Sequence, residues 1–347
     1  MMNSELEQKI GQMLLIGFRG LELENHHPII EDIRARHLGG VVLFDYDVGA
    51  RSPVRNIDSP EQVQRLTASL QDLAQEPLFI GIDQEGGKVS RLKEHFGFPP
   101  SVSAQYLGEL DQVDVTRKHA ALTAQTLAEL GINLNFAPAV DLNIYPENPI
   151  IGKVERSFSA DAEVVIRHAR QWIACHHAQG VLCALKHFPG HGSSRHDTHL
   201  GFVDVTDTWS ADELRPYQEL VRSGFDDMIM TAHIFNARLD PECPATLSYA
   251  LITGVLREQL GYGGVVISDD MQMKAIADHY TFETAIQSAL EAGVDILAFG
   301  NNLNYNGNIM ARAVAIISQL VRQGALSEQR IDESYQRILR LKAGLQT

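Results

Sequence analysis

Short apolar runs recur along the chain, and most are rich in Val, Ile, Leu or Met without alternating polar residues. Continuous apolar runs of this length predict β-strands that are buried on both faces, as in a parallel sheet. The expected strands are Met13–Phe18, Gly40–Phe44, Leu78–Ile82, Leu134–Ala137, Val181–Leu185, Asp227–Thr231, Val265–Ser268 and Ile296–Phe299.

Amphipathic stretches lie between these runs and predict helices. Ser59-Pro60 and the segment from Ser210 to Glu213 are typical helix starts, because the Ser hydroxyl can accept from the first free N–H groups. The expected helices are Pro28–His37, Pro60–Ala74, Gln112–Leu130, Ala162–Gln179, Ala211–Ser223, Tyr249–Gln259, Phe282–Ala292, Asn308–Gln323 and a final helix at Ser327–Leu345.

The alternation of about eight strands with helices predicts an α/β fold, a (β/α)₈ TIM-type barrel forming a single domain over residues 1–347. The alternative is an open doubly wound sheet. Against it, no Gly-x-Gly-x-x-Gly turn follows the first expected strand. The Gly86-Gly87 pair follows the third strand instead and lacks a phosphate-loop pattern, so it predicts a tight turn.

The amino-acid composition excludes some classes of function and of binding partner. With 347 residues, 44% of them hydrophobic, the chain can bury a large core. Its formal net charge of −15 argues against nucleic acid or an anionic membrane as a partner. The widely spaced Cys175, Cys183 and Cys243 are expected to be small packing residues, not a disulfide framework or zinc site.

The N-terminal segment, residues 1–9, is polar and acidic, so no secretory signal is expected there. No apolar run reaches the length that spans a membrane. We therefore expect a cytoplasmic protein, a monomer or weak oligomer, that uses no cofactor.

Polar residues follow many of the expected strands where each strand ends. In a barrel these ends meet at one rim, where catalytic residues of such barrels lie. The pattern therefore predicts an active site that can bind a polyhydroxylated ligand. The residues at these positions are Asp83, Asp141, Lys186, His187, His233, Asp269, Asp270, Asn301 and Asn302. Among them, Asp270 is expected to cap a helix over Met271–Asp278.

Asp197-Thr198-His199 follows the glycine-rich run Lys186–Gly192. In an Asp-x-His pair the carboxylate can hold one imidazole nitrogen while the other faces a substrate, which suits proton transfer near neutral pH. Alone, the pair is more often typical of a polar loop that satisfies its own hydrogen bonds, since proton transfer needs a geometry that spacing cannot prove. His191 either bonds within this loop or joins the site. The glycines predict that the loop can swing.

A metal-dependent hydrolase is an alternative, because barrel metalloenzymes use such ligands. Those enzymes usually carry His-x-His at the end of the first strand, where this chain has Phe18-Arg19-Gly20, so no metal is expected. The candidate ligands are His187, His191, His196, His199, Asp197 and Asp269.

At these residues the chain resembles glycoside hydrolase family 3, in particular its single-domain β-N-acetylglucosaminidases. The matching segments are Asp83–Arg91, Lys186–Gly192 with Asp197–His199, Pro244–Ser248, Val266–Asp270 and Arg337–Lys342. Larger members of the family add a second domain that can supply the acid/base. Since this chain ends with the barrel, the resemblance implies that the proton donor comes from within it.

The resemblance implies a role for each matching position. Asp269 corresponds to the nucleophile and His199 to the acid/base, oriented by Asp197. The positions expected to bind the sugar or anchor its loops are Asp83, Arg91, Arg156, Lys186 and His187. Arg156 lies in a loop, Asn148–Phe158, that is longer than is usual in the family.

The implied activity is exo-acting removal of terminal β-linked N-acetylglucosamine, with retention, from muropeptides or short amino-sugar oligosaccharides. The partner would be a small carbohydrate. The family also permits β-glucosidase, β-xylosidase and phosphorylase activities. A sugar-binding barrel without catalysis is a further alternative, although the intact nucleophile and dyad positions argue against it. His199 is followed by Leu-Gly-Phe instead of the frequent Leu-Pro, so the resemblance says less about the leaving group than about the sugar.

Overall fold

Parallel strands form the centre of the molecule. The computed structural model describes residues 4–345, and within them an eight-stranded sheet pairs in the order β10-β1-β2-β3-β4-β5-β7-β9. The strands are β1 (Leu14–Gly17), β2 (Gly40–Leu43), β3 (Phe79–Ile82), β4 (Leu134–Asn135), β5 (Leu182–Phe188), β7 (Met228–Thr231), β9 (Val265–Ile267) and β10 (Leu297–Phe299).

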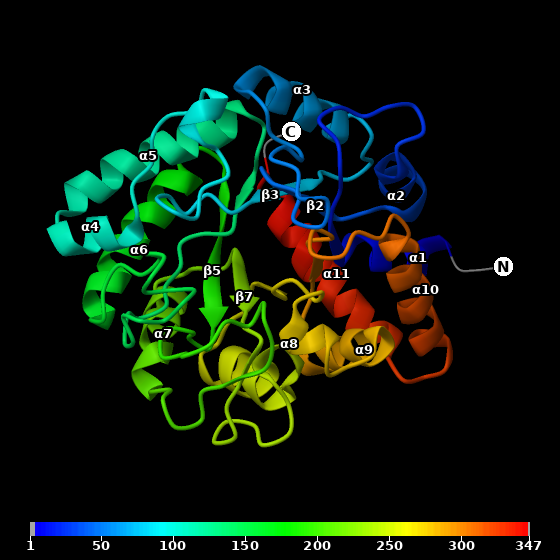
Figure 1. The fold of residues 1–347 in the computed structure, drawn as a ribbon. Helices are drawn as coiled ribbons and strands as arrows, with labels where there is room; N and C mark the ends of the chain where they lie inside the picture. The colour runs from blue at the N-terminus through cyan, green and yellow to red at the C-terminus, as the bar shows by residue number, and fades with distance from the viewer. Residues whose placement is uncertain (1–3, 346–347) are drawn as a thin grey trace.

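The two ends of this sheet meet and close it. Ile267 and Ile296 form a parallel bridge, and the backbone N–H of Ser268 donates to the carbonyl of Ile296 at 2.9 Å. Figure 1 shows the helices arranged around the strands. The predicted (β/α)₈ barrel is confirmed. The alternative, a doubly wound sheet, is wrong, because such a sheet has two open edges and this one is closed.

A helix follows each strand of the barrel, as predicted, with bounds that differ by a few residues at the ends. Ser59 accepts from the N–H of Gln62, and Ser210 with Glu213 forms a capping box. The helices are α2 (Pro28–Arg36), α3 (Pro60–Gln71), α5 (Val113–Glu129), α6 (Ala162–His177), α7 (Arg215–Arg222), the π-helix η4 (Ala250–Gln259), α9 (Phe282–Ala292), α10 (Ile309–Arg322) and the closing α11 (Glu328–Lys342).

Several short elements were not predicted. The strands β6 and β8 pair only with each other and are too short for a periodic pattern to reveal. Helix α1 begins inside the polar N-terminal segment, whose residues 1–3, like 346–347 at the other end, lie outside the described residues. The missed elements are α1 (Ser4–Gln12), α4 (Ala104–Leu110), β6 (Val203–Asp204), β8 (Ile234–Phe235) and the 3₁₀ turns η1 (Glu94–Phe96) and η3 (Ala245–Leu247). Two further short elements, η2 (Ala211–Leu214) and α8 (Lys274–Ala277), fall within the helices expected over Ala211–Ser223 and Met271–Asp278.

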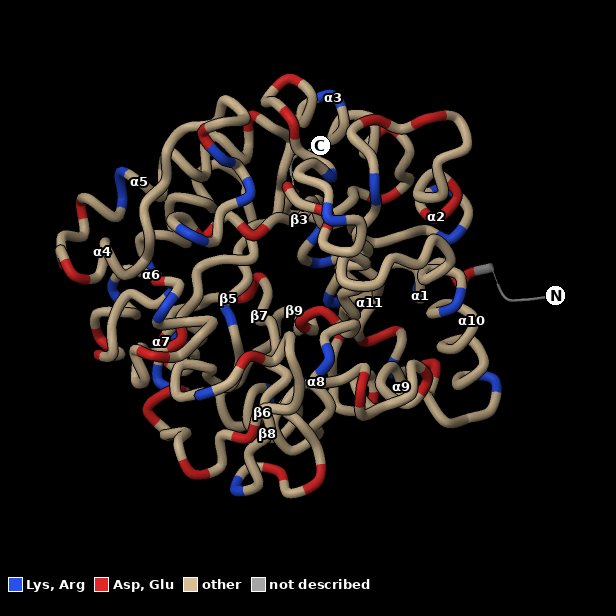
Figure 2. The backbone as a smooth tube through the Cα atoms, in the orientation of Figure 1, with Lys and Arg blue, Asp and Glu red and all other residues tan. Residues whose placement is uncertain are grey.

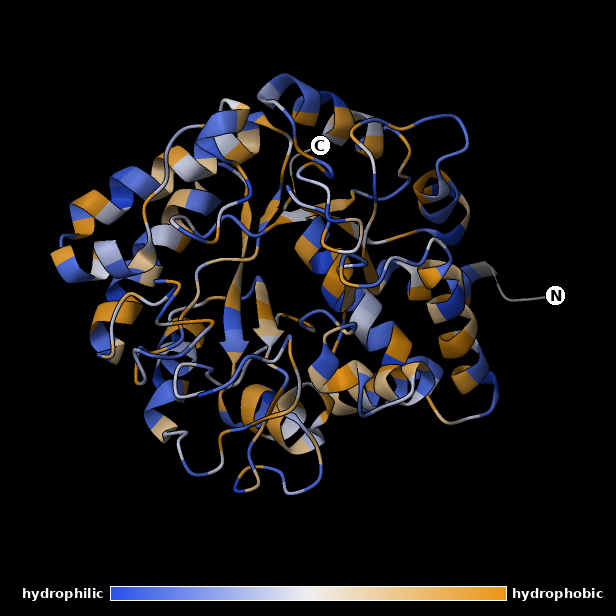
Figure 3. Ribbon diagram, in the orientation of Figure 1, coloured by the Kyte–Doolittle hydropathy of each residue, from blue (hydrophilic) through white to orange (hydrophobic). Residues whose placement is uncertain are grey.

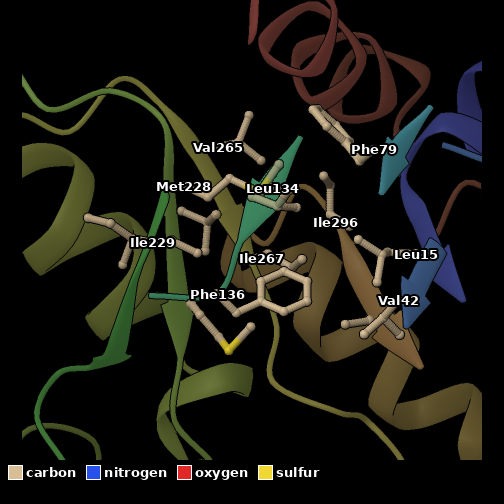
Figure 4. Packing of buried hydrophobic residues seen from close by; sticks show 14 of the residues in the cluster. Leu15, Val42, Phe79, Leu134, Phe136, Met228, Ile229, Val265, Ile267 and Ile296 are labelled. Carbon is tan, nitrogen blue, oxygen red and sulfur yellow. The ribbon is translucent and has the colours of Figure 1, made fainter. Parts of the chain in front are cut away.

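Apolar side chains fill the barrel and the layer between strands and helices. Every residue of β1, β2, β3 and β7 is buried, which is the reason their sequences do not alternate. Figure 4 shows Leu15, Val42, Leu134, Met228 and Ile267 from different strands packed together. Cys175, Cys183 and Cys243 are free thiols, as the sequence predicted.

Charged residues are interspersed along the whole backbone (Figure 2). Within residues 4–345 no helix combines the length and the apolar character needed to cross a lipid bilayer.

The buried carboxylate of Asp295 ties three elements together just before β10. Its oxygens accept from Arg257 of η4 at 2.6 Å, from Arg337 of α11 at 3.0 Å, from the Ser334 hydroxyl at 2.6 Å and from the N–H of Val266 in β9 at 2.9 Å. A carboxylate can be buried only with such partners, because desolvation of an unpaired charge is prohibitive. Asp295 thus joins the last helix to the barrel.

We expect Asp295→Asn to destabilise the protein by ~3–5 kcal/mol, because the variant leaves the two partly buried guanidinium groups of Arg257 and Arg337 without their buried counter-charge. Denaturant unfolding monitored by circular dichroism measures the loss. Asp114→Asn is the matched control, since Asp114 pairs with Arg117 while 89% exposed, and its effect should stay below ~1 kcal/mol. Equal stability of the two variants would contradict the account.

Candidate active site

A cavity of about 370 Å³ opens at the carboxyl ends of the strands. This size is in the usual range for small-molecule sites. All of the site residues expected from the sequence line it, namely Asp83, Arg91, Arg156, Lys186, His187, Asp197, His199 and Asp269. The barrel therefore brings together residues that are up to 186 positions apart in the sequence, whereas the roles expected for them remain predictions.

Lys186 lies at the floor of the cavity, on β5, where Figure 3 shows the strand turning from hydrophobic to hydrophilic toward its arrowhead. Its side chain is 2% exposed, and its Nζ lies 2.7 Å from Asp83 Oδ1 and 2.6 Å from Glu85 Oε1. Burial alone would raise the pKa of Asp83, but the charges of Lys186 and then Arg91 outweigh it and lower that pKa. The Asp83 carboxyl therefore stays ionised beside Lys186 and Arg91.

Arg156 reaches the cavity from the long loop. It donates from Nε and Nη2 to the two oxygens of Glu85 at 2.8 and 2.7 Å, from Nη1 to the carbonyl of Ile150 at 2.9 Å and from Nη2 to His187 Nε2 at 3.0 Å. A guanidinium has five N–H bonds, so these contacts leave one N–H on Nη1 for a ligand. Burial raises the pKa of Glu85, but Arg156 and Lys186 bring it down to about 2.

His187 is held from both sides. Because Arg156 can only donate, His187 Nε2 accepts, and the proton on Nδ1 is donated to Asp141 Oδ2 at 2.7 Å. Asp141 also accepts from the N–H of His191 at 2.7 Å. Burial raises the pKa of Asp141, yet His187 and His191 lower it to about 2. Both ring nitrogens of His187 are thus already paired with protein groups.

The Asp-x-His pair has the geometry that its spacing predicted. Asp197 Oδ1 accepts from Nδ1 of His199 and from its backbone N–H, both at 2.8 Å, so Nε2 is the nitrogen left for a ligand. The side chain of His199 is 50% exposed and that of Asp197 22%. Burial lowers the pKa of His199, but the hydrogen bond with Asp197 and the charge of Asp269 outweigh it and raise that pKa above its ordinary value.

The beginning of this loop is packed in place. A Cβ on Gly192 would lie 1.6 Å from the carbonyl oxygen of Leu142, so glycine is required there by close packing. The side chain of Asn148 donates to the carbonyl of His191 at 2.8 Å, and Glu213 accepts from the N–H of Gly192 at 3.0 Å. Gly192 therefore allows close packing here and gives no sign of a swinging loop. The exposed part of the loop begins at Arg195.

Asp269 follows β9 and is partly buried against the cavity. Its Oδ1 accepts from the N–H of Asp270 at 2.7 Å. Burial raises the pKa of the Asp269 carboxyl, but the facing imidazoles, His233 first and then His187, hold it below its ordinary value. The site therefore contains an ionised carboxylate whose orientation is set by a backbone amide.

The expectation that Asp270 caps a helix over Met271–Asp278 is wrong. Helix α8 starts later, and its N-cap residue is Met273. Asp270 Oδ1 instead accepts from the N–H groups of Gln272 and Gly300, both at 3.0 Å. The side chain therefore links the end of β9 to the end of β10, a contact between distant segments that no local pattern reveals.

Glu85 and Asp141 are the residues whose importance the sequence reasoning missed. Asp141 was noted at a strand end and Glu85 lies in the matching segment Asp83–Arg91, but neither received a role. Glu85 pairs with Lys186 and Arg156, and Asp141 accepts from Nδ1 of His187. The sequence did contain a signal for such carboxylates, because a cation buried at a strand end, such as Lys186, needs a carboxylate nearby. Apolar residues of the long loop, Pro149, Ile150 and Val154, also line the cavity and gave no such signal.

The candidate metal ligands are not arranged for a metal. Within the described residues 4–345, no group of three or more His, Cys, Asp or Glu side chains is placed to hold an ion. His187 has both nitrogens occupied, and His196 is exposed and does not line the cavity. The donor set therefore does not fit the metal-dependent hydrolase.

Known sequences resemble the chain over most of its length. The model of the glycosyl hydrolase family 3 N-terminal domain matches residues 5–341. A protein named beta-hexosaminidase A from Pseudoalteromonas piscicida is 33% identical over 97% of this chain, which spans 61% of that relative. One named beta-hexosaminidase from Tolumonas auensis (strain DSM 9187 / NBRC 110442 / TA 4) is 34% identical over 88% of this chain and 86% of its own length.

Solved structures agree with this likeness. A glycoside hydrolase family 3 beta-N-acetylglucosaminidase from Paenibacillus sp. str. FPU-7 superposes with a TM-score of 0.87 at 36% identity, covering 98% of this chain and 62% of the other. A beta-N-acetylhexosaminidase from Beutenbergia cavernae DSM 12333 has a TM-score of 0.84 at 30% identity, covering 98% and 100%. The resemblance inferred from the motifs is confirmed, and the chain belongs to glycosyl hydrolase family 3.

Proposed function

We propose that the protein is an exo-acting, retaining β-N-acetylhexosaminidase that removes terminal β-linked N-acetylglucosamine from muropeptides or short amino-sugar oligosaccharides. Relatives named beta-hexosaminidase support the sugar specificity. The observation that carries the mechanism is one cavity lined both by an ionised, oriented Asp269 and by the Asp197–His199 pair.

In the first step Asp269 attacks the anomeric carbon. His199, protonated on Nε2, gives that proton to the oxygen of the departing group, so the glycosidic C–O bond breaks as the C–O bond to the carboxylate forms. The low pKa of Asp269 keeps it ionised for attack, and the raised pKa of His199 keeps its proton available near neutral pH.

In the second step a water molecule gives a proton to the neutral Nε2 of His199 and attacks the anomeric carbon. The bond to Asp269 breaks and the sugar leaves with net retention. A neutral imidazole repels an anion less than a second carboxylate would. A histidine in this role therefore leaves phosphate open as an alternative acceptor, which would make the reaction a phosphorolysis.

Sugar hydroxyls would be bound by the groups that protein contacts leave free. Asp83 retains lone pairs, Lys186 one N–H and Arg156 one N–H after their mutual contacts. Acceptors and donors side by side suit hydroxyl groups, which need both. We further propose that the protein acts in the cytoplasm on small carbohydrates without a cofactor. Its acidic net charge favours such a partner over nucleic acid or an anionic membrane.

Replacing Asp269 by Ala should lower turnover of an aryl β-N-acetylglucosaminide by ~10⁴-fold or more, because the covalent step is lost. Steady-state kinetics measure this, with Asp207→Ala as an active control, since Asp207 is an exposed partner of Arg238. The wild-type kcat/KM should be highest for the N-acetylglucosaminide among matched aryl glucosides and xylosides. Near-normal activity of Asp269→Ala would overturn the mechanism, and preference for glucoside or xyloside would overturn the specificity.

The alkaline limb of the kcat/KM pH profile should report loss of the His199 proton and lie above the ordinary imidazole pKa, because that pKa is raised. Asp197→Asn removes the carboxylate charge that raises the pKa of His199. His199 then loses its proton at lower pH, so the alkaline limb should shift to lower pH. Profiles of wild type and variant, measured on the same glycoside, check this. An alkaline limb that stays in place would exclude His199 as the acid that Asp197 tunes.

A further inference from the structure

The proposed chemistry leaves two features of this rim without a role. One is His233, which follows β7 and is buried. The other is Thr246, also buried, in the turn η3 of the family-like segment Pro244–Ser248. They come together behind the nucleophile, and neither lines the cavity, so neither is placed to touch a sugar.

A chain of hydrogen bonds runs from these residues to the end of β9. Thr231 Oγ1 lies 2.8 Å from Thr246 Oγ1, which lies 2.8 Å from His233 Nδ1. His233 Nε2 lies 3.0 Å from the carbonyl oxygen of Asp270. A carbonyl only accepts, so Nε2 carries a proton and donates it. The Thr246 hydroxyl is in turn within 2.9 Å of the Ala232 carbonyl.

Asp270 is the residue that this chain holds, and it is fixed at three points. Its carbonyl accepts from His233, its Oδ1 accepts from the N–H groups of Gln272 and Gly300, and its own N–H donates to Asp269 Oδ1 at 2.7 Å. The last bond sets the direction of the nucleophilic carboxylate. Any rotation of the Asp270 backbone would therefore turn Asp269 relative to the anomeric carbon.

We propose that His233, braced by Thr246, is a positioning residue for the nucleophile: it fixes the Asp270 backbone so that the Asp270 amide aims Asp269 at the anomeric carbon. This inference rests on the proposed function, in which Asp269 is the nucleophile. Attack requires the reacting atoms to be aligned at about 3–3.5 Å, and a misplacement of about 1 Å can cost ~10²-fold in rate. Sugar binding uses other groups and stays intact.

The test compares His233→Phe, which keeps a ring without a donor, with His233→Gln, whose amide nitrogen can reach the Asp270 carbonyl. We expect kcat to fall ~10²-fold in the Phe variant with KM within about twofold of wild type, and the Gln variant to recover at least ~10-fold of that loss. Kinetics on an aryl β-N-acetylglucosaminide separate kcat from KM, since a general loss of structure would not be rescued by Gln.

His168→Phe is the matched control. His168 is another fully buried histidine whose Nδ1 lies 2.7 Å from a threonine hydroxyl, that of Thr116, but it lies on α6 outside the cavity. Its variant should keep wild-type kcat. If His233→Phe does not fold, Thr246→Val removes only the bracing hydroxyl and should still lower kcat with KM unchanged.

Three results would overturn the inference: full kcat in the folded His233→Phe variant, no recovery with Gln, or an equal loss in His168→Phe. The Asp269→Ala variant, assayed beside them, separates the two proposals. If Asp269→Ala is inactive while His233→Phe keeps full kcat, only the positioning role fails. If Asp269→Ala remains active, the proposed function itself fails.

Discussion

The ammonium group of Lys186 is nearly excluded from water and is neutralised by Asp83 and Glu85 at 2.7 and 2.6 Å. An unpaired charge at this depth would cost several kcal/mol. The loop after β3 and the strand β5 therefore have to bring these groups together for the barrel to close around them. Arg156 and Asp141 extend the same pairing to the long loop and to His187. The shape of the cavity follows from this requirement for charge pairing.

The pairing also divides the rim into two kinds of residue. Arg156 and His187 spend most of their hydrogen-bonding capacity on protein partners, so they mainly hold the cavity in shape. Asp269 and Nε2 of His199 keep reactive atoms free, and each is oriented by a single short bond, from the Asp270 amide and from Asp197 respectively. In the proposed reaction the first group keeps the cavity in shape around the sugar while the second makes and breaks bonds.

The barrel could be predicted from sequence because fully buried parallel strands leave a strong local signal, uninterrupted apolar runs. The candidate site could be predicted because Lys186 and Asp269 stand in distinctive motifs at strand ends and Asp197 in a distinctive loop motif. What escaped prediction depends on contacts between distant segments. Asp270 bonds to Gly300, His233 to Asp270, and β6 to β8, and none of these contacts has a periodicity of its own. Partners of this kind are set by the closed barrel.

The most direct test of the central claim, a covalent intermediate on Asp269, is mass spectrometry of the peptide that carries the trapped sugar. A fluorinated N-acetylglucosaminyl fluoride slows release of the sugar and lets the glycosyl-enzyme accumulate. The account predicts one adduct per chain, located on Asp269, and a β-anomer as the first product seen by NMR with the normal substrate. An adduct on another carboxylate, or an α-anomer as the first product, would contradict it.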